Sequence, residues 1–492
     1  MSTAIRFDNS YARELKGFYV PWEGAEVPEP RMVLFNRRLA DALGLDVDAL
    51  DSPQGAAFFT GAAAPEGAEP LAQVYAGHQF GGFSPQLGDG RALLVGEILD
   101  PGGRRWDLHL KGSGRTPFSR GGDGKAVLAP VLREYLIGEA MYALGIPTTR
   151  ALAAATTGER IVRDGGPKPG AVLARIASSH LRIGTFQFFA ARGQMDHVAQ
   201  LVGYALRRHA PELANADDPA LELLRLVRDR QAALVAQWMG VGFIHGVMNT
   251  DNTTISGETL DYGPCAFMDR YDPATVFSSI DRHGRYAYGN QPAIMQWNLA
   301  RLAEAILPLI RAEDEAAGVQ IATDEIEAFA PLYRAEWVRV MRAKLGLEGG
   351  DARLADDLFA AMSGEGVDFT RFFRALGRVM REGSAASGDL RVLFDHPEAI
   401  DGWLGRWSER VAAGGPGAAE RADAMDRVNP VYVPRNHLVE AALQAAEAHG
   451  ELGPLATLLE VLQDPYRERA GYEGFADPAP DDFGPYVTYC GT

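Results

Sequence analysis

Cysteine is almost absent from this chain of 492 residues, since only Cys265 and Cys490 occur. Two thiols are too few for a disulfide framework, so the composition favours a reducing compartment. Long apolar runs are also missing, and residues 1–9 carry neither an apolar signal core nor an Arg-rich amphipathic pattern. We therefore expect a cytoplasmic protein with no membrane partner.

A basic excess is lacking as well. Lys and Arg number 48 against 65 Asp and Glu, and the net charge of −17 is spread along the chain rather than held in one tail. Such a surface repels the phosphates of nucleic acid and of anionic lipid. Nucleic acid is therefore not an expected partner, and any phosphate-binding site must be local.

The apolar content of 47% is enough for a large core, and the length indicates more than one domain. The early part of the chain favours strands and one convincing helix, and the part after residue 220 favours helices. A Gly/Ala/Pro-rich stretch at 55–70 is typical of a linker. The expected strands are 91–98, 105–110 and 171–176, and the expected helices are 128–144, 221–239, 294–312 and 325–345.

A small β-rich lobe followed by a larger helical lobe is the layout of a protein-kinase-like bilobal fold of the α+β class, although this layout alone suits many enzymes. We expect an N-terminal segment, two lobes and a helical C-terminal extension. The expected boundaries are 1–74, 75–193, 194–348 and 349–492.

The segment His245-Gly-Val-Met-Asn-Thr-Asp-Asn252 has the spacing of a kinase catalytic loop, with Asp261-Tyr-Gly263 following it. Asn252 and Asp261 then occupy the two metal-ligand positions, and their oxygens suit Mg²⁺ or Mn²⁺. Val247 stands where the kinase base would be and cannot accept a proton. Asp251 is the nearest replacement. The alternative is that these polar residues only stabilise turns.

Lys111 ends one expected strand and Glu134 lies in the following helix, as in the lysine–glutamate pair of kinases. The alternative is two solvated charges. Gly88 and Gly90 in Gln86-Leu-Gly-Asp-Gly-Arg91 are weaker evidence for a phosphate-facing loop. Basic residues gather nearby, and arginines can clamp phosphate, although some of these would be ordinary strand-edge charges. They are Arg115, Arg120, Lys125, Arg175 and Arg182.

These blocks, together with Tyr75-Ala-Gly-His-Gln-Phe-Gly81 and Leu110-Lys-Gly-Ser-Gly-Arg-Thr-Pro117, resemble the selenoprotein O family of kinase-like protein adenylyltransferases, called YdiU in bacteria. The resemblance covers nearly the whole chain. It implies that ATP binds inverted, with its γ-phosphate buried among basic side chains and its α-phosphate presented to the acceptor. AMP is then transferred to a protein hydroxyl and pyrophosphate leaves.

The resemblance also implies roles for single residues. Asp251 would be the catalytic base, and Asn252 and Asp261 would hold Mg²⁺ or Mn²⁺. Expected partners are ATP and protein substrates that carry acceptor hydroxyls, and the chain is expected to act as a monomer. The implied nucleotide contacts are Gly88, Gly90, Arg91, Lys111, Asp123, Gly124, Arg175, Arg182 and Asp261.

Cys490 lies where some members of the family carry selenocysteine, which implies a redox role. Other members have a cysteine after the Asp-Tyr-Gly triplet, but the matching position here is Phe277, and Cys265 lies closer to the metal ligand. Three functions stay open. They are an adenylyltransferase, which could also use UTP, a kinase-like phosphotransferase, and a nucleotide-binding pseudokinase scaffold.

Overall fold

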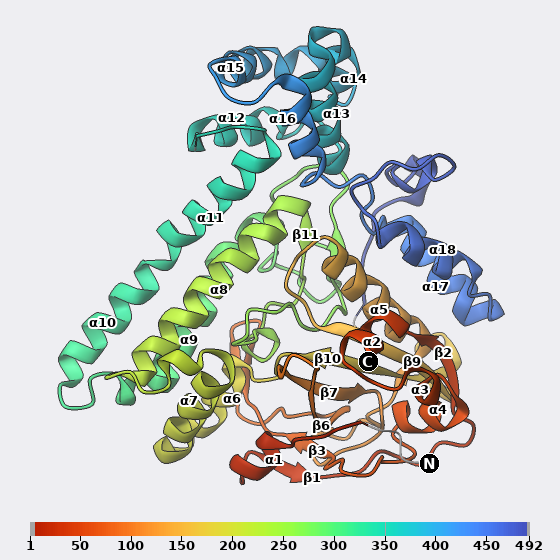
Figure 1. Ribbon diagram of the computed structural model, residues 1–492, viewed down its shortest axis with the longest axis vertical. Coiled ribbons are helices and arrows are strands. Elements are labelled where there is room, and N and C mark those ends of the chain that lie inside the picture. Colours follow the sequence, from red (N-terminus) through yellow and green to blue (C-terminus); the bar gives the residue numbers. More distant parts are fainter. Residues whose placement is uncertain (1–4, 350, 490–492) are drawn as a thin grey trace.

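An eight-stranded antiparallel sheet forms the first part of the protein, and helices form most of the rest (Figure 1). The computed structural model describes residues 5–349 and 351–489. The strand order is β1-β3-β6-β7-β10-β9-β2, and β8 pairs with β10 beside this path. The strands are β1 Tyr19–Pro21, β2 Arg31–Phe35, β3 Leu71–Gln73, β6 Ala92–Leu99, β7 Arg105–Lys111, β8 Ala126–Val127, β9 Arg150–Arg163 and β10 Gly166–Ala177.

The two faces of this sheet are covered by different helices. Helix α5 (Leu128–Ala143) packs on one face. The short helices α2 (Arg37–Ala42), α3 (Val47–Leu50) and α4 (Pro53–Phe59) cover the other, where a separate apolar cluster forms. Successive residues of a strand point to opposite faces, so each strand contributes to both layers.

Helices beyond the sheet form a second, larger part of the molecule. Two small two-stranded sheets lie apart from the large one: β4 (Gly77–Gln79) pairs with β5 (Gly82–Ser84), and β11 (Phe243–Ile244) pairs with β12 (Ala266–Phe267). Apart from α2 to α5, the helices up to residue 344 are α1 Ser10–Glu14, α6 Ile183–Ala190, α7 Met195–His209, α8 Pro219–Val241, α9 Gln291–Ile306, α10 Glu315–Glu327 and α11 Phe329–Lys344.

The last helices divide into two groups. One group gathers at the end of the molecule furthest from the sheet (Figure 1, top), and α17 and α18 return to pack against α5. Their bounds are α12 Ala352–Met362, α13 Phe369–Glu382, α14 Ser387–Arg391, α15 Asp401–Ala412, α16 Ala418–Asp426, α17 Asn436–Gln444 and α18 Gly453–Leu462.

Most of the expected elements are confirmed, and the exceptions have physical causes. The stretch 55–70 is not simply a linker, because α4 begins at Pro53 with Ser52 as its N-cap and buries Phe58 and Phe59. The helix expected over 294–312 ends at Ile306, two residues before Pro308. The helix expected over 325–345 is split at Ala328 into α10 and α11.

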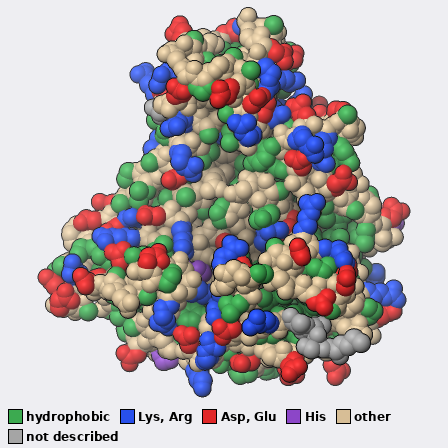
Figure 2. All heavy atoms as spheres, in the orientation of Figure 1, with side chains coloured by type: hydrophobic (Ala, Val, Ile, Leu, Met, Phe, Trp, Pro, Cys, Tyr) green, Lys and Arg blue, Asp and Glu red, His purple; other side chains and the backbone are tan. Residues whose placement is uncertain are grey.

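No helix in the described ranges combines the length and the apolar character that a membrane crossing demands. Figure 2 shows basic and acidic side chains interspersed over the visible face rather than separated into large patches of one sign.

A buried arginine joins the helical part to the sheet. Arg208 of α7 donates to Asp107 Oδ1 of β7 at 2.6 Å, to the carbonyl of Ser178 at 2.8 Å, and also to Glu97 of β6. Its side chain is 4% exposed, and those of the two acids are 2% and 1% exposed. Three charges buried in this way are tolerated because each has a partner of opposite sign.

We expect Arg208→Met to lower the free energy of unfolding by about 3–5 kcal/mol, because it removes the arginine from two buried acids and leaves Glu97 with only Arg105, 3.6 Å away. Chemical denaturation at neutral pH measures this loss. Arg207→Met is the matched control, since the Arg207 side chain is 56% exposed and pairs with Glu14 at the surface. The free energy of unfolding of Arg207→Met should fall by less than about 1 kcal/mol. Equal losses of unfolding free energy in the two variants would contradict the role of Arg208 as a buried counter-charge.

Candidate functional site

Strand β7 presents polar side chains on the sheet face that α5 covers. Leu108 and Leu110 pack in the apolar cluster beneath α2, α3 and α4. Alternation therefore places His109 and Lys111 on the opposite face. Arg175 of β10 is the register partner of His109 and lies on the same face. The period of the strands thus brings three basic side chains together.

Lys111, Arg175, Glu134 of α5 and Asp261 form a group that we call the charge cluster. Lys111 Nζ lies 2.7 Å from Glu134 Oε2 and also contacts Asp261 Oδ1. Arg175 Nη1 lies 3.1 Å from Glu134 Oε1 and 2.9 Å from Asp261 Oδ1. Each cation thus touches both carboxylates. The expected contact between Lys111 and Glu134 is confirmed, and Arg175 joins it.

Opposite charges in the cluster keep Asp261 and Arg175 ionised. Burial alone would raise the pKa of Asp261, but Lys111 and Arg175 hold that pKa well below its ordinary value. Burial would likewise lower the pKa of Arg175, but Asp261 and Glu134 raise it. The Arg175 side chain is 3% exposed. The cluster therefore offers fixed, desolvated charges to an incoming anion.

Asp261 sits in a strained turn. Its φ is +65°, in the left-handed region that a residue other than glycine enters only when its surroundings require it. The hydroxyl of the neighbouring, buried Tyr262 hydrogen-bonds with Thr148. Both ion pairs of Asp261 are made through Oδ1. Oδ2 is therefore the oxygen that a cation would take.

Asn252 ends the short 3₁₀ turn Thr250–Asn252, in the catalytic-loop segment. Its Nδ2 donates to the carbonyl of Val247 at 3.2 Å, so the amide oxygen faces away from Val247. Within the described ranges, no three His, Cys, Asp or Glu side chains gather closely enough to hold a metal ion by themselves. A divalent ion with these ligands would need further oxygens, such as those of phosphates.

Asp251 is buried beside this turn, with 8% of its surface exposed. Burial raises the pKa of its carboxyl to about 6. Oδ2 accepts a hydrogen bond from Gln79 Nε2 at 3.0 Å, and Oδ1 has no hydrogen-bond partner among the described residues. Val247, at the position of the missing kinase acid, is also buried.

Arg182 lies next to the cluster on the chain that follows β10, and 2% of its surface is exposed. Its guanidinium lies 4.4 Å from the centre of the Tyr75 ring, and Nη1 lies 3.6 Å from Asp89 Oδ1. Its Nε has no hydrogen-bond partner in the described part of the chain. The Nε atoms of six other arginines in the described ranges also lack a partner, so this feature is not specific to the site.

Gly88 and Gly90 lie in the loop between β5 and β6. At Gly88, where φ is +75°, a Cβ would lie 2.4 Å from the ring of Phe118, and at Gly90 it would lie 2.8 Å from the Phe118 carbonyl. Both positions thus require glycine for close packing within the chain. Arg91, next to them, is half-buried and lines a cavity together with Lys111.

Asp123 and Gly124 lie in the loop that joins β7 to β8. The carboxylate of Asp123 is bound by Arg163, with Nη1 and Oδ2 2.8 Å apart, and this hydrogen bond is the main reason that its pKa is lowered. Gly124 has a φ of +68°, and its carbonyl accepts from Gly114 N at 3.1 Å. The structure therefore pairs the Asp123 side chain with Arg163 rather than with the charge cluster.

The cavity beside Lys111 has a volume of about 590 Å³ and lies between α5, β8 and the C-terminal segment 483–489. Arg91, Lys111 and Glu134 line it from the sheet side, and Tyr486 closes it. The Tyr486 hydroxyl donates to Glu440 at 2.6 Å and accepts from Arg133 Nη1 at 3.1 Å. The C-terminal segment is thus part of the surroundings of the site.

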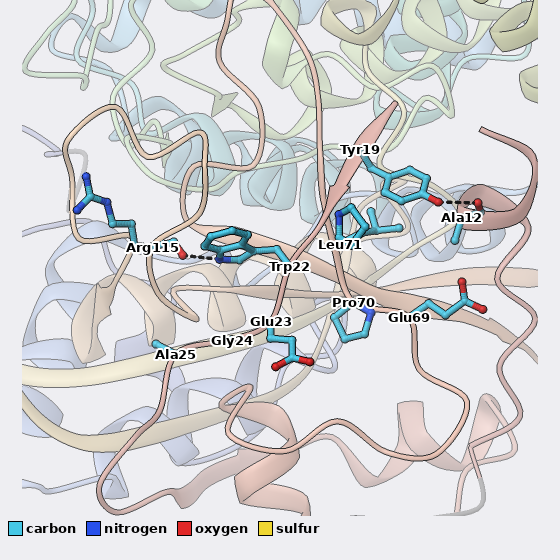
Figure 3. Close-up of a pocket in the computed structure, with 11 residues that line it drawn as sticks. Ala12, Tyr19, Trp22, Glu23, Gly24, Ala25, Glu69, Pro70, Leu71 and Arg115 are labelled. Atoms are coloured by element: carbon cyan, nitrogen blue, oxygen red, sulfur yellow. Dashed lines mark hydrogen bonds between the residues drawn. The ribbon is translucent and has the colours of Figure 1, made fainter. Parts of the chain in front are cut away.

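A larger hollow of about 780 Å³ lies beside the short strand β1 (Figure 3). Trp22 lies within it and donates from Nε1 to the carbonyl of Arg115 at 2.7 Å. Glu23 and Glu69 add acidic groups to its lining. Arg115, expected among the phosphate-clamping cations, thus belongs to this hollow and not to the charge cluster.

The thiol of Cys265 is buried close to the Asp-Tyr-Gly triplet, and burial raises its pKa to about 12. A thiol in this state is a poor nucleophile. Phe277, where the resemblance implied a cysteine, packs against Tyr486 with ring centres 5.8 Å apart. Cys490 lies outside the described residues.

Several residues near the site were not assigned a role from the sequence. Gln79 lies in the block 75–81, which marked the family without indicating a contact. Asp89 and His109 hydrogen-bond at 3.2 Å, and Asp89 also faces Arg182. Tyr486 is far from the other site residues in sequence. The alternation of polar and apolar residues in 105–110 is the signal that could have identified His109.

Comparison with known proteins agrees with the resemblance seen in the sequence. Residues 2–463 match the family described as protein adenylyltransferase SelO. A protein nucleotidyltransferase YdiU of Cereibacter sphaeroides strain KD131 is 60% identical over 492 residues, covering 99% of this chain and 100% of the relative. Proteins of the same name from Sphingopyxis alaskensis and Rhizobium leguminosarum bv. trifolii are 56% and 54% identical, covering 99% of this chain and 99% and 98% of their own lengths.

The expected family and the expected enzyme class are therefore confirmed. The chain belongs to the SelO family of protein adenylyltransferases and is a nucleotidyltransferase.

Proposed function

We propose that this enzyme transfers AMP from ATP to a Ser, Thr or Tyr hydroxyl of a protein substrate and releases pyrophosphate. The observation that carries the proposal is the charge cluster beside Asp251. Lys111 and Arg175 are fixed by two carboxylates, and a buried acid with one unpaired oxygen lies in the loop before Asp261. Phosphate binding and proton removal are the two tasks that nucleotidyl transfer requires.

ATP binds in the inverted direction in this proposal, with its γ-phosphate toward Arg175 and Arg182 and its α-phosphate toward the acceptor. The deep burial of both arginines supports this direction. Guanidinium groups suit the terminal phosphate because they donate two hydrogen bonds in parallel. The remaining nucleotide contacts are assigned to Gly88, Gly90, Arg91, Lys111, Asp123, Gly124 and Asp261.

Asn252 and Asp261 would hold Mg²⁺ or Mn²⁺ through the Asn252 amide oxygen and Asp261 Oδ2. Two protein oxygens are a suitable set because Mg²⁺ usually takes its other ligands from water and substrate phosphates. The bound ion would offset the negative charge that develops on the phosphates in the transition state.

Asp251 accepts the proton of the acceptor hydroxyl, whose oxygen then forms a bond to the α-phosphorus as the bond to pyrophosphate breaks. Val247 cannot do this, since it has no proton acceptor. The unpaired Oδ1 of Asp251 is the atom assigned to the proton.

The scaffold proposed for this chemistry is a protein-kinase-like bilobal fold. Segments 75–193 and 194–348 would be its two lobes, with 349–492 as a helical extension. Strands β1, β2 and β3 of segment 1–74 complete the sheet of the first lobe. The pairing of Lys111 with a helix glutamate and the order of Asn252 and Asp261 support this assignment.

Labelled nucleotide separates this function from its alternatives, a phosphotransferase and a nucleotide-binding scaffold. With Mg²⁺ or Mn²⁺ and ATP labelled on the α- or the γ-phosphate, we expect α-label on protein and γ-label in released pyrophosphate. Self-modification serves as the assay where no substrate protein is known. Stable γ-label on protein without α-label would show phosphorylation, and nucleotide binding without either label would show a scaffold. Labelled UTP, run in parallel, tests the nucleotide preference.

Asp251→Asn should lower kcat about 10²–10⁴-fold, because general-base catalysis contributes by this factor. Nucleotide affinity should change little, since Asp251 takes no part in the charge cluster. Steady-state kinetics and calorimetric titration with a non-hydrolysable ATP analogue measure the two quantities. Weak nucleotide binding with normal turnover at saturation would make Asp251 a binding residue instead.

Glu134→Gln should weaken turnover about ten- to a hundredfold, because Lys111 and Arg175 lose one of the two charges that orient them and keep only Asp261. Glu139→Gln is the matched control on the same helix. Glu139 is as buried as Glu134 and pairs with Arg150 at 2.7 Å, away from the cluster. We expect this variant to lower the melting temperature but to keep nucleotide affinity and kcat. If both variants behaved alike, Glu134 would have only a structural role.

A further inference from the structure

The hairpin formed by β4 and β5, residues 77–84, binds the loop that carries Asp251. The backbone N–H of His78 donates to Thr250 Oγ1 at 2.7 Å, and Gln79 Nε2 donates to Asp251 Oδ2 at 3.0 Å. The backbone N–H of Phe80 donates to the side-chain oxygen of the preceding loop residue, Asn249, at 3.1 Å. Successive hairpin residues thus hold residues 249–251 by one hydrogen bond each.

The turn of this hairpin is unusual. Gln79 pairs with Gly82, so Phe80 and Gly81 are the two loop residues, and their φ values are +51° and +86°. Two-residue hairpin loops of this kind favour Asn, Asp or Gly at the first position, because a side chain is strained there. The hydrogen bond from the Phe80 N–H to Asn249 stabilises Phe80 in this conformation. The conformation of the turn is therefore tied to the catalytic-loop segment.

Asp251 is also enclosed by backbone that carries no side chain. A Cβ on Gly77 would lie 2.6 Å from Asp251 Oδ1, and a Cβ on Gly184 of α6 would lie 3.4 Å from its Cα and 2.1 Å from the carbonyl of Ala76. The two glycines let the hairpin and α6 approach the acid closely. The Asp251 side chain consequently has little room to change its rotamer.

Within this enclosure the two carboxylate oxygens of Asp251 differ. Oδ2 is held by Gln79, whereas Oδ1 has no hydrogen-bond partner among residues 5–349 and 351–489 although it is buried. One N–H···O bond to a carboxylate in a tight enclosure is enough to set the plane of the group. The held oxygen thus determines where the free oxygen points.

We propose that Gln79 is a positioning residue for the transfer reaction: it fixes the Asp251 carboxylate through Oδ2 and leaves Oδ1 free of hydrogen bonds to accept the proton of the acceptor hydroxyl. This inference rests on the proposed role of Asp251 as the base. An amide suits the task because it donates a hydrogen bond without a charge. A lysine or arginine here would form an ion pair with the carboxylate that must receive the proton.

Gln79→Leu tests the proposal, since leucine is of similar size and cannot donate. We expect kcat to fall about ten- to a hundredfold, because a misplacement of about 1 Å at a reacting group can cost a hundredfold. The KM for ATP, the affinity for a non-hydrolysable ATP analogue and the melting temperature should change little. Ser84→Ala, on the paired strand β5, is the control within the same hairpin and should keep the wild-type kcat.

Gln79→Glu shows whether the hydrogen bond from Gln79 or only the shape of its side chain matters for turnover. Glutamate has nearly the shape of glutamine but places a carboxylate against Asp251 Oδ2 in place of the donor. We expect this variant to lose at least as much kcat as Gln79→Leu. Wild-type turnover in Gln79→Glu would overturn the proposal, because only the shape of the side chain would then matter.

A double-mutant cycle with Asp251→Asn shows whether Gln79 acts through Asp251. In the Asp251→Asn background, Gln79→Leu should cause no further loss of α-label transfer. An equal loss in both backgrounds would overturn the proposal, as would wild-type kcat in Gln79→Leu. Absence of α-label transfer by the wild-type enzyme would instead refute the proposed function, so the two failures can be told apart.

Discussion

The rest of the site depends on the ion pairs among Lys111, Arg175, Glu134 and Asp261. Taking an ionised group out of water costs several kcal/mol, and this cost is offset only where each charge meets an opposite one at close range. The four side chains come from β7, β10, α5 and the turn that follows the catalytic-loop segment. Because none of them can be buried alone, these elements must meet at one place.

A second set of polar contacts fixes the helical part against the sheet. Arg208 reaches from α7 to β6 and β7, and the β4–β5 hairpin reaches from the chain after β3 to residues 249–251. The Arg208 contact is buried and the hairpin contacts are partly buried, and a hydrogen bond that loses its partner away from water is costly. The charge cluster and Asp251 therefore keep their relative positions while apolar packing stabilises each part.

Part of this arrangement was predictable from local patterns, and part was not. Strand β7 alternates polar and apolar residues and α5 carries apolar residues at i+4 steps, so both elements were predictable from the sequence. The pairing of Lys111 with Glu134 was expected from the order of residues in kinases, with two solvated charges as the alternative, and the structure confirms the contact. Strand β9 was missed, because its first half is the run Ala151-Leu-Ala-Ala-Ala155 and alanine does not favour strands. Its burial against α5 and the neighbouring strands stabilises it instead. Arg115 was grouped with the phosphate cations by its place in the chain, yet it lines a different hollow.

The sequence by itself determined the family, the enzyme class and the residue types available for phosphate and metal binding, because these depend on side-chain chemistry at fixed spacings. Tertiary structure alone decided that Arg175 shares both carboxylates with Lys111, that Asp123 is bound by Arg163, and that Gln79 holds one oxygen of Asp251. These contacts join residues from 40 to 172 positions apart. Spacing along the chain carries no information at such separations, since the folding of the sheet against the helices sets which side chains meet.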